Sequence, residues 1–259
     1  MAGGFFLFFS QVLVAQVDVS KISKPFKIGE SITYKITYNW GLIWVDAGEV
    51  TFSVEKAMNK DKEAFHFVGD GKTYPKYDWF YKVRDRYESY ADQMSLRPYR
   101  FIRDVEEGKE YYHNQYLFDH EKDLAFSFFK KPKKEMLRDT IDFPPGVFDV
   151  LSMIYYARCL NWNSYAIDQE VPIKLILDGK VYDSYIRYLG KEMREVEGLG
   201  EISCIKFRPR LIEGTIFPGG EEMTVWVTDD KNRIPVYIKT PILVGNIRAI
   251  LKTATGTKY

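Results

Sequence analysis

Short runs of alternating apolar and polar residues, each ended by turn residues, recur along most of the chain. In the run ESITYKITYNW, for example, isoleucine and tyrosine alternate with threonine and lysine. Because successive side chains of a β-strand point to opposite faces, this pattern predicts half-buried strands. The connections are too short for crossover helices, so we expect the strands to pair antiparallel.

One segment departs from the alternation. FPPGVFDVLSMIYYARCLNW has apolar residues at helical spacing and predicts one helix over residues 147–159. Strand patterns continue on both sides of it, and no Ser/Gly/Pro-rich linker divides the chain. We therefore expect a mostly β fold, a large antiparallel meander forming a curved sheet or barrel-like sandwich with one helix near its middle. Residues 16–259 would form a single domain of two strand-rich halves, two separate domains being the alternative.

Residues 1–15 form an apolar run that Ser10 and Gln11 interrupt. The run is shorter than the roughly 20 apolar residues of a transmembrane helix but has the length of a signal-peptide core, with a cleavage site after Ala15. No lysine or arginine precedes it, so either the true start lies upstream or the segment is a buried strand. We expect a signal peptide over residues 1–15 and an exported mature chain with no transmembrane span. No cysteine follows the run, so a lipid anchor is not expected.

The charge of the chain is balanced, with 37 Lys and Arg against 36 Asp and Glu, a net charge of +1. This balance gives no electrostatic footprint for nucleic acid or for an anionic membrane. Aromatic residues make up 16% of the chain, which again favours strands, where flat rings pack well on a pleated face.

Metal, redox and nucleophile chemistry find little support in the sequence. The three histidines are His66, His113 and His120, and the last two would lie roughly 23 Å apart along one strand. Cys159 and Cys204 lack CxxC spacing and either pair in an oxidising compartment or remain buried thiols. The chain contains no GxSxG, Walker-type or HExxH motif. We expect no metal site and no cofactor.

Acids on apolar faces are the best candidates for a perturbed pKa. Asp85 shares a predicted strand face with Trp79, Tyr81, Val83 and Tyr87, and its simplest role is to pair with a buried arginine such as Arg103. Asp149 stands at the start of the predicted helix, where a carboxylate caps free N–H groups. Arg158 stands at the helix end and complements the helix dipole there.

Two further groups of residues are candidates for ligand contact. Trp40, Trp44, Trp79 and Tyr81 either line a concave sheet or belong to the core, and the tract NWGLIWVDAGE has the pattern of a hairpin tip that exposes apolar groups. The segment VWVTDDKNRIPVYIKT reads as a hairpin with a solvated corner, in which Arg233 is the candidate for a ligand contact. Its Pro235 lacks an N–H, which favours an edge strand or an outward-pointing position.

The order of these motifs resembles a known family. FKIGESITYKITYNWGLIWVDAGEVTFSV, the helix FDVLSMIYYAR, the DGKVY hairpin and VWVTDDKNRIPVYI are together similar to the exported bacterial family called domain of unknown function 3108, over about residues 26–253. The resemblance implies a β-rich protein of the periplasm or cell envelope of a Gram-negative bacterium. It brings no established activity and no catalytic residues.

Three classes of function remain open. We favour a noncatalytic envelope protein that binds or carries an amphiphilic ligand, a lipid or glycolipid, in a concave β sheet. The second is a glycan hydrolase that uses an Asp/Glu pair. The third is a structural or assembly protein that pairs through an edge strand. Ligand identity and oligomeric state are not encoded in any pattern of the sequence.

Overall fold

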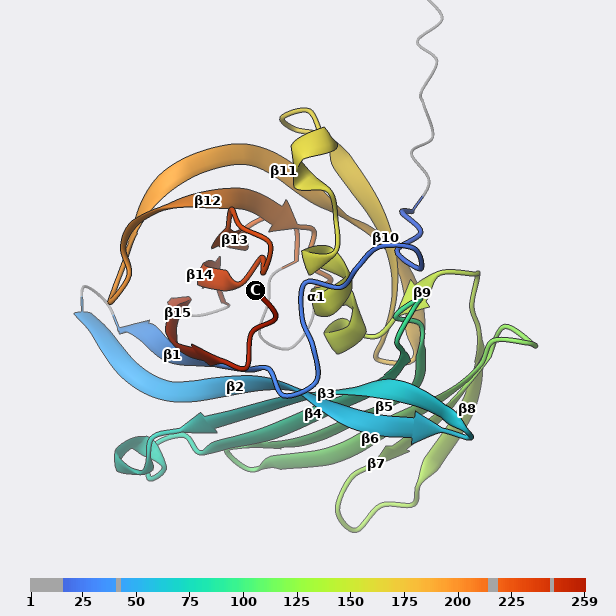
Figure 1. The fold of residues 1–259 in the computed structure, drawn as a ribbon. Helices are drawn as coiled ribbons and strands as arrows, with labels where there is room; N and C mark the ends of the chain where they lie inside the picture. The colour runs from blue at the N-terminus through green and yellow to red at the C-terminus, as the bar shows by residue number, and fades with distance from the viewer. Residues whose placement is uncertain (1–15, 41–42, 214–218, 243–244) are drawn as a thin grey trace, which may run out of the picture.

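The structure is a computed structural model of the 259-residue chain, and it describes residues 16–40, 43–213, 219–242 and 245–259. The described residues form one sheet of fifteen strands, with a single α-helix (Figure 1). The strands are β1 Ser31–Trp40, β2 Ile43–Asn59, β3 Lys62–Thr73, β4 Val83–Asp92, β5 Pro98–Glu107, β6 Glu110–Asp119, β7 Leu124–Lys130, β8 Leu137–Asp142, β9 Val147–Phe148, β10 Glu170–Leu177, β11 Lys180–Val196, β12 Gly200–Pro209, β13 Thr224–Thr228, β14 Pro235–Pro241 and β15 Asn246–Thr255. The helix α1 is Val150–Arg158, and two short 3-10 turns cover Pro75–Tyr77 and Trp162–Ser164.

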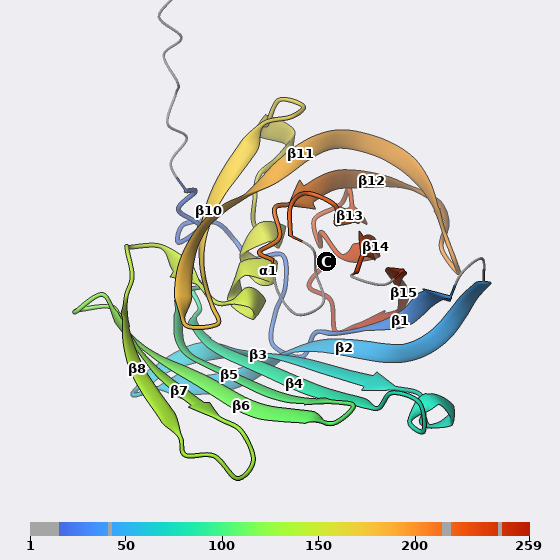
Figure 2. The same ribbon diagram turned by 180° about the vertical axis from the view of Figure 1, so that it is seen from behind.

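The sheet is a meander whose two ends remain apart. Its spatial order is β8-β7-β6-β5-β4-β3-β2-β1-β15-β14-β13-β12-β11-β10-β9. All neighbours pair antiparallel except β9 and β10, which are parallel. The first and second halves join through β1 and β15, which lie side by side. The sheet curls into a barrel-like shape without closing, because β8 and β9 are its two edges (Figure 2). The predicted mostly β fold, a curved meander with one helix, is confirmed.

The helix α1 lies inside the curve of the sheet and contacts β3, β4, β9 and β10 (Figure 1). Tyr155 stacks on Phe67 of β3 with ring centroids 3.9 Å apart. Gly69 of β3 lies between Phe52 and Leu151 of the helix, and a Cβ at this position would be 3.3 Å from the Phe52 ring and 3.5 Å from Leu151. The helix thus fills much of the concave side, so the interior of the curved sheet is largely a packed core.

The predicted helix is confirmed, with slightly narrower bounds. It begins after Asp149, whose carboxylate accepts hydrogen bonds from the backbone N–H groups of Leu151 and Ser152. The second carboxylate oxygen accepts from the Ser89 hydroxyl of β4. Asp149 is fully buried, and burial raises its pKa to about 6. Its role is that of the helix cap that the sequence predicts.

The end of α1 is tied to both halves of the sheet by a buried ion pair. The Arg158 guanidinium donates to both carboxylate oxygens of Glu30, at 2.6 and 2.9 Å, and to the carbonyl oxygen of Asn232. The side chains of Arg158 and Glu30 are 3% and 1% exposed. Because Glu30 directly precedes β1 and Asn232 lies in the β13–β14 turn, this pair fixes the helix against the seam of the two halves.

One local prediction is wrong, and another keeps only one of its alternatives. The strand expected from Trp79 onward begins only at Val83, because residues 75–80 form a 3-10 turn and a loop. Of the two alternatives for Pro235, the edge strand is excluded, because β14 lies between β13 and β15; Pro235 is the first residue of β14 and lies beside a register shift. The two cysteines do not pair: Cys159 and Cys204 are free and buried. The predicted signal peptide lies outside the described residues.

Candidate functional site

The concave face of the first half contains a hollow of about 380 Å³. Two adjacent rows of cross-strand neighbours form its floor. One row runs from Arg103 through Asn114 and Phe129 to Leu137, and the other includes Ser127 and Asp139. The β10–β11 turn, Asp178–Gly179, covers the hollow from the second half of the sheet. The site therefore lies where the two ends of the meander approach each other.

The covering turn is held in place by two contacts across the hollow. Arg103 donates to the Asp178 carboxylate at 2.5 Å, and the backbone N–H of Gly179 donates to the Tyr116 hydroxyl at 2.9 Å. Asp178 and Gly179 have φ values of 46° and 78°, so the Asp-Gly hairpin turn predicted from the sequence is confirmed. The turn is thereby a fixed wall of the hollow.

Arg103 is a buried cation with one bond left unmade. Its guanidinium lies 4.9 Å from the ring centroid of Tyr112, and the residue is 9% exposed. Its Nε is buried and has no hydrogen-bond partner, and the same holds for Oδ1 of Asn114, which is directly opposite on β6. Buried polar atoms in proteins nearly always have partners. A donor and an acceptor without partners therefore belong to two neighbouring residues that line the hollow.

The other part of the hollow is apolar and open. Phe129 and Leu137 are cross-strand neighbours on β7 and β8, and Leu137 is 65% exposed. Because β8 is an edge of the sheet, this apolar side lies at the rim of the hollow. The hollow thus joins a buried polar end to an exposed apolar end.

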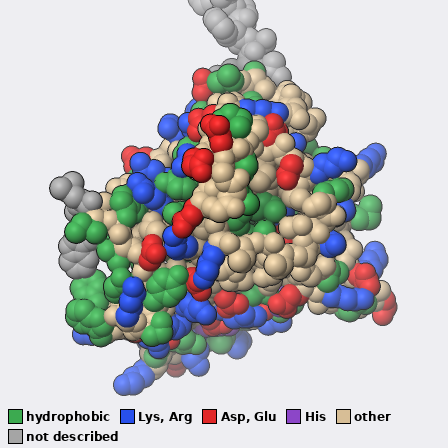
Figure 3. Space-filling view, turned by 60° about the vertical axis from the view of Figure 1, so that its left-hand side comes forward, with side chains coloured by type: hydrophobic (Ala, Val, Ile, Leu, Met, Phe, Trp, Pro, Cys, Tyr) green, Lys and Arg blue, Asp and Glu red, His purple; other side chains and the backbone are tan. Residues whose placement is uncertain are grey.

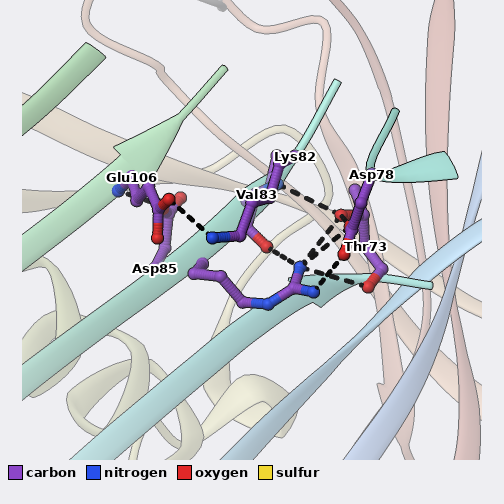
Figure 4. A network of polar contacts seen from close by, with 7 residues as sticks. Thr73, Asp78, Lys82, Val83, Asp85 and Glu106 are labelled. Atoms are coloured by element: carbon purple, nitrogen blue, oxygen red, sulfur yellow. Dashed lines mark hydrogen bonds and ion pairs between the residues drawn. The ribbon is translucent and has the colours of Figure 1, made fainter. Parts of the chain in front are cut away.

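Asp85 lies next to this floor, on the same face of β4. It is the cross-strand neighbour of Val105, and the following row on that face pairs Tyr87 with Arg103. Burial, together with the neighbouring carboxyl of Glu107, raises the pKa of Asp85 to about 7. Its Oδ1 accepts a hydrogen bond from the backbone N–H of Glu106 (Figure 4). Arg103 pairs with Asp178 rather than with Asp85.

A second hollow, of about 230 Å³, lies over β2, β3 and β4 and is lined mainly by charged side chains. Arg86 pairs there with Asp70, and Glu49 with Lys252. On the face shown in Figure 3, cationic side chains lie among anionic ones in the same way, in keeping with the net charge of +1. This hollow is a salt-bridged surface groove and a weaker candidate than the first.

A match to a family model shows to which protein family the chain belongs. The model described as protein of unknown function DUF3108 matches residues 33–252, most of the chain. The protein belongs to the DUF3108 family. The resemblance seen in the sequence is thereby confirmed.

Structural similarity extends beyond the DUF3108 family. The chain is similar to the crystal structure of a beta-barrel-like protein of domain of unknown function DUF1849 from Brucella abortus, with a TM-score of 0.57 and 10% identity. The match covers 90% of this chain and 98% of that one, and at this identity it shows a shared fold. No curated protein sequence matches the chain.

The structure separates the predicted ligand-contact residues of this DUF3108 protein. Of these, Arg103 lines the hollow and Asp85 lies beside it. Asp149 and Arg158 are buried at the two ends of α1, in the cap and the ion pair described above. Arg233 lies in the β13–β14 turn, where its backbone N–H donates to Asp230.

Of the aromatic residues predicted either to line a concave sheet or to belong to the core, Trp79 and Tyr81 do neither. Trp79 and Tyr81 project from the β3–β4 loop and are 84% and 48% exposed. The Arg248 guanidinium lies over the Trp44 ring, 3.3 Å from the ring centroid. Trp40 ends β1, and its side chain lies outside the described residues. The rings near the hollow, Tyr112 and Phe129, come from strands that the sequence marks only by alternation.

Within the described residues, no three His, Cys, Asp or Glu side chains gather as a metal site. His66 contacts Glu55 and Glu88, and His113 contacts Asp104. The described part of the DUF3108 chain also contains no helix long and apolar enough to cross a bilayer.

Proposed function

We propose that this protein is an exported, noncatalytic binding protein of the cell envelope that holds an amphiphilic ligand in the hollow beneath the β10–β11 turn. The observation that carries the proposal is the pair of unpartnered buried atoms, Arg103 Nε and Asn114 Oδ1. The apolar rim next to them supplies the second half of an amphiphilic site. The apolar run over residues 1–15, which has the length of a signal-peptide core, supports the location.

The chemistry of the two atoms indicates the ligand's polar group. Arg103 Nε is a donor and Asn114 Oδ1 is an acceptor. A hydroxyl group both donates and accepts, so the hydroxyl groups of a sugar can supply the partner of either atom. A phosphate or carboxylate only accepts when it is ionised and would leave Asn114 unpaired. The polar end of the site therefore favours a sugar head group, and the ligand class is a glycolipid.

The dimensions of the site suit part of such a molecule. A volume of about 380 Å³ lies at the lower end of the roughly 300–1,000 Å³ typical of ligand pockets. A head group would occupy the floor, and the acyl chain would leave past Leu137 at the edge strand β8. The interior around α1 is filled by the protein's own buried side chains, so the ligand would stay in the hollow.

Native mass spectrometry of the mature chain purified from its own compartment tests the proposal. We expect a bound mass in stoichiometric amount that denaturing extraction releases as a glycolipid. The variant Asn114→Leu keeps the side-chain volume but removes the acceptor, and it should carry much less of that mass. A protein that is empty in both forms would contradict the proposal.

Glycan hydrolysis is the second candidate, because a carboxyl with a pKa near 7 beside a polar hollow has the property of a general acid. Its expected signature is release of reducing sugar from envelope glycans that Asp85→Asn abolishes. Binding of a glycolipid without turnover by the wild type would favour the first proposal.

A further inference from the structure

The strand β8 is a long unpaired edge of the described sheet. It ends the spatial order of the strands and stands at the outside of the sheet in Figure 2. Each of its six residues except Ile141 is exposed. The other edge strand, β9, has only two residues, and so short an edge offers little to a further strand. Among the described residues, β8 is therefore the edge on which a further strand can pair.

The backbone groups of every second β8 residue point to the open edge. The N–H of Phe143, the residue after β8, donates at 2.9 Å to the carbonyl oxygen of Asp123, the residue before β7. Because the backbone groups of successive strand residues point to opposite sides, those of residues 138, 140 and 142 point away from β7. The N–H of Thr140 agrees with this direction, since it donates to the Asp139 side chain at 2.8 Å.

Two opposite charges flank Thr140 at equal spacing, on the face of β8 that lies opposite the hollow. Arg138 and Asp142 are exposed, and neither enters an ion pair among the described residues. They are roughly 13 Å apart along the strand and do not reach each other. Their cross-strand neighbours on β7, Phe128 and Leu124, are apolar. Both charges are therefore free to pair with a strand that adds to the edge.

The turns near the two ends of β8 differ in charge in the same sense. Residues 130–136 contain four lysines and one glutamate, and one of the lysines, Lys131, pairs with Glu110. The β6–β7 turn, residues 120–123, contains two acids and one lysine, and that lysine pairs with Asp119. The end of β8 at Arg138 is thus the positive end, and the opposite end is negative.

We propose that β8 pairs antiparallel with β8 of a second copy of this chain, about a two-fold axis at Thr140. Arg138 then lies opposite Asp142 of the second copy, and the symmetry repeats this pair on the other side of the axis. All three residue pairs have backbone groups that face the partner strand, so each pair exchanges both of its hydrogen bonds once Asp139 releases the Thr140 N–H.

The charges select this register. Charges on an edge strand usually prevent pairing, but here each charge meets its opposite. Opposite charges directly across two strands stabilise the pair, and like charges destabilise it. An axis at Asp139 would set two carboxylates against each other, and an axis at Ile141 would leave Arg138 and Asp142 unpaired. A strand of unrelated sequence would not match both charges, whereas a second copy does so by symmetry.

Analytical ultracentrifugation of the full mature chain at increasing protein concentration tests the proposal. We expect an equilibrium of monomer and dimer. Arg138→Asp places a carboxylate opposite Asp142 of the second copy, and it should raise the dimer dissociation constant at least roughly tenfold. Asp142→Arg places two cations opposite each other and should do the same. An equal mixture of these two variants should regain the dimer, because both cross-strand pairs are then of opposite sign.

Two further variants separate strand pairing from a general effect of charge. Glu201→Arg and Lys239→Asp, combined in one chain, reverse two exposed charges on β12 and β14, and this matched control should dimerise like the wild type. Thr140→Pro removes an N–H that points away from β7, so it should weaken the dimer while circular dichroism shows an unchanged fold.

A wild type that remains monomeric at the highest concentration would overturn the proposal. A dimer that either charge reversal leaves intact, or a mixture of the two variants that stays monomeric, would overturn it as well. Monomers that bind a foreign peptide strand along β8 in place of a second copy would also contradict it. The glycolipid proposal does not depend on this result, because the hollow is probed with Asn114→Leu.

Discussion

Arg103 and Asp178 are 75 residues apart in the chain, and their side chains meet at 2.5 Å across the candidate site. The contact joins β5 in the first half of the sheet to the β10–β11 turn in the second. It therefore fixes the distance between two parts of a sheet that does not close through its edges. The same contact shapes the hollow, so the stability of the fold and the shape of the candidate site depend on the same pair.

Asp178→Asn should keep the positive-φ turn, which Asn tolerates, and remove the partner of a buried guanidinium. We expect the free energy of unfolding to fall by about 1–3 kcal/mol in urea denaturation. Asp183→Asn is the matched control, because Asp183 pairs with Lys174 with a side chain 83% exposed. Its effect should be within about 0.5 kcal/mol. Equal effects of the two substitutions would contradict a structural role for the Arg103 pair.

Removing one partner of the buried pair Glu30–Arg158 should be among the most damaging single changes. Arg158→Met leaves the Glu30 carboxylate without its cation at 1% exposure, and we expect a loss of about 3–5 kcal/mol. The double variant Glu30→Leu, Arg158→Met removes both charges and should lose less than the sum of the single variants. Additive losses in denaturant titrations would show that the two side chains do not interact.

The cap of α1 offers a smaller and more local test. Asp149→Ala removes the acceptor for two backbone N–H groups and for Ser89, and should cost about 1–2 kcal/mol or slightly more. Asp149→Asn retains an acceptor oxygen for the cap and should cost less. Urea titrations of the two variants measure the difference, and Asp149→Asn as damaging as Asp149→Ala would argue against capping.

The raised pKa of Asp85 predicts a pH dependence of stability. Its pKa is about 7 in the folded state, against about 3.9 in the unfolded chain. The folded state therefore holds the proton more tightly, and the stabilisation from Asp85 is fully present below about pH 4 and lost as the pH rises through 7. Asp85→Asn should remove this dependence, so that its stability relative to wild type increases between pH 5 and 8. Wild-type and variant curves that remain parallel over this interval would show an ordinary Asp85 pKa.

Much of the fold could be predicted because it is local. The alternation of apolar and polar residues identifies the strands. Asp149 marks the start of the helix because a helix cap depends only on the few residues that directly follow it. The same local rule fails at Trp79, because large apolar residues at every second position also occur in residues 74–82, which form a 3-10 turn and a loop. At Pro235 it excludes too much, because a bulge in β14 itself lets a residue without an N–H stand inside the sheet.

The candidate site could be predicted only in part. Arg103 and Asp85 stand out because a charge interrupts an apolar face of a strand. Asn114 and Asp178 give no comparable signal: an Asn on a polar-looking strand and an Asp in a hairpin turn both have ordinary local explanations. The importance of Asp178 arises from its contact with Arg103 across 75 residues, which depends on how far the sheet curls, and that of Asn114 from its place opposite Arg103.

Calorimetric titration of the mature protein with octyl glucoside, below its micelle concentration, is the direct test of whether the hollow binds a sugar head group. Wild type should bind it in the hollow, and Asn114→Leu should bind at least roughly tenfold more weakly, the equivalent of one lost hydrogen bond to a buried group. Octyl sulfate has the same alkyl chain but no hydroxyl group. It should bind the wild type no more tightly than it binds Asn114→Leu. Equal affinities of wild type and Asn114→Leu for octyl glucoside would contradict the claim.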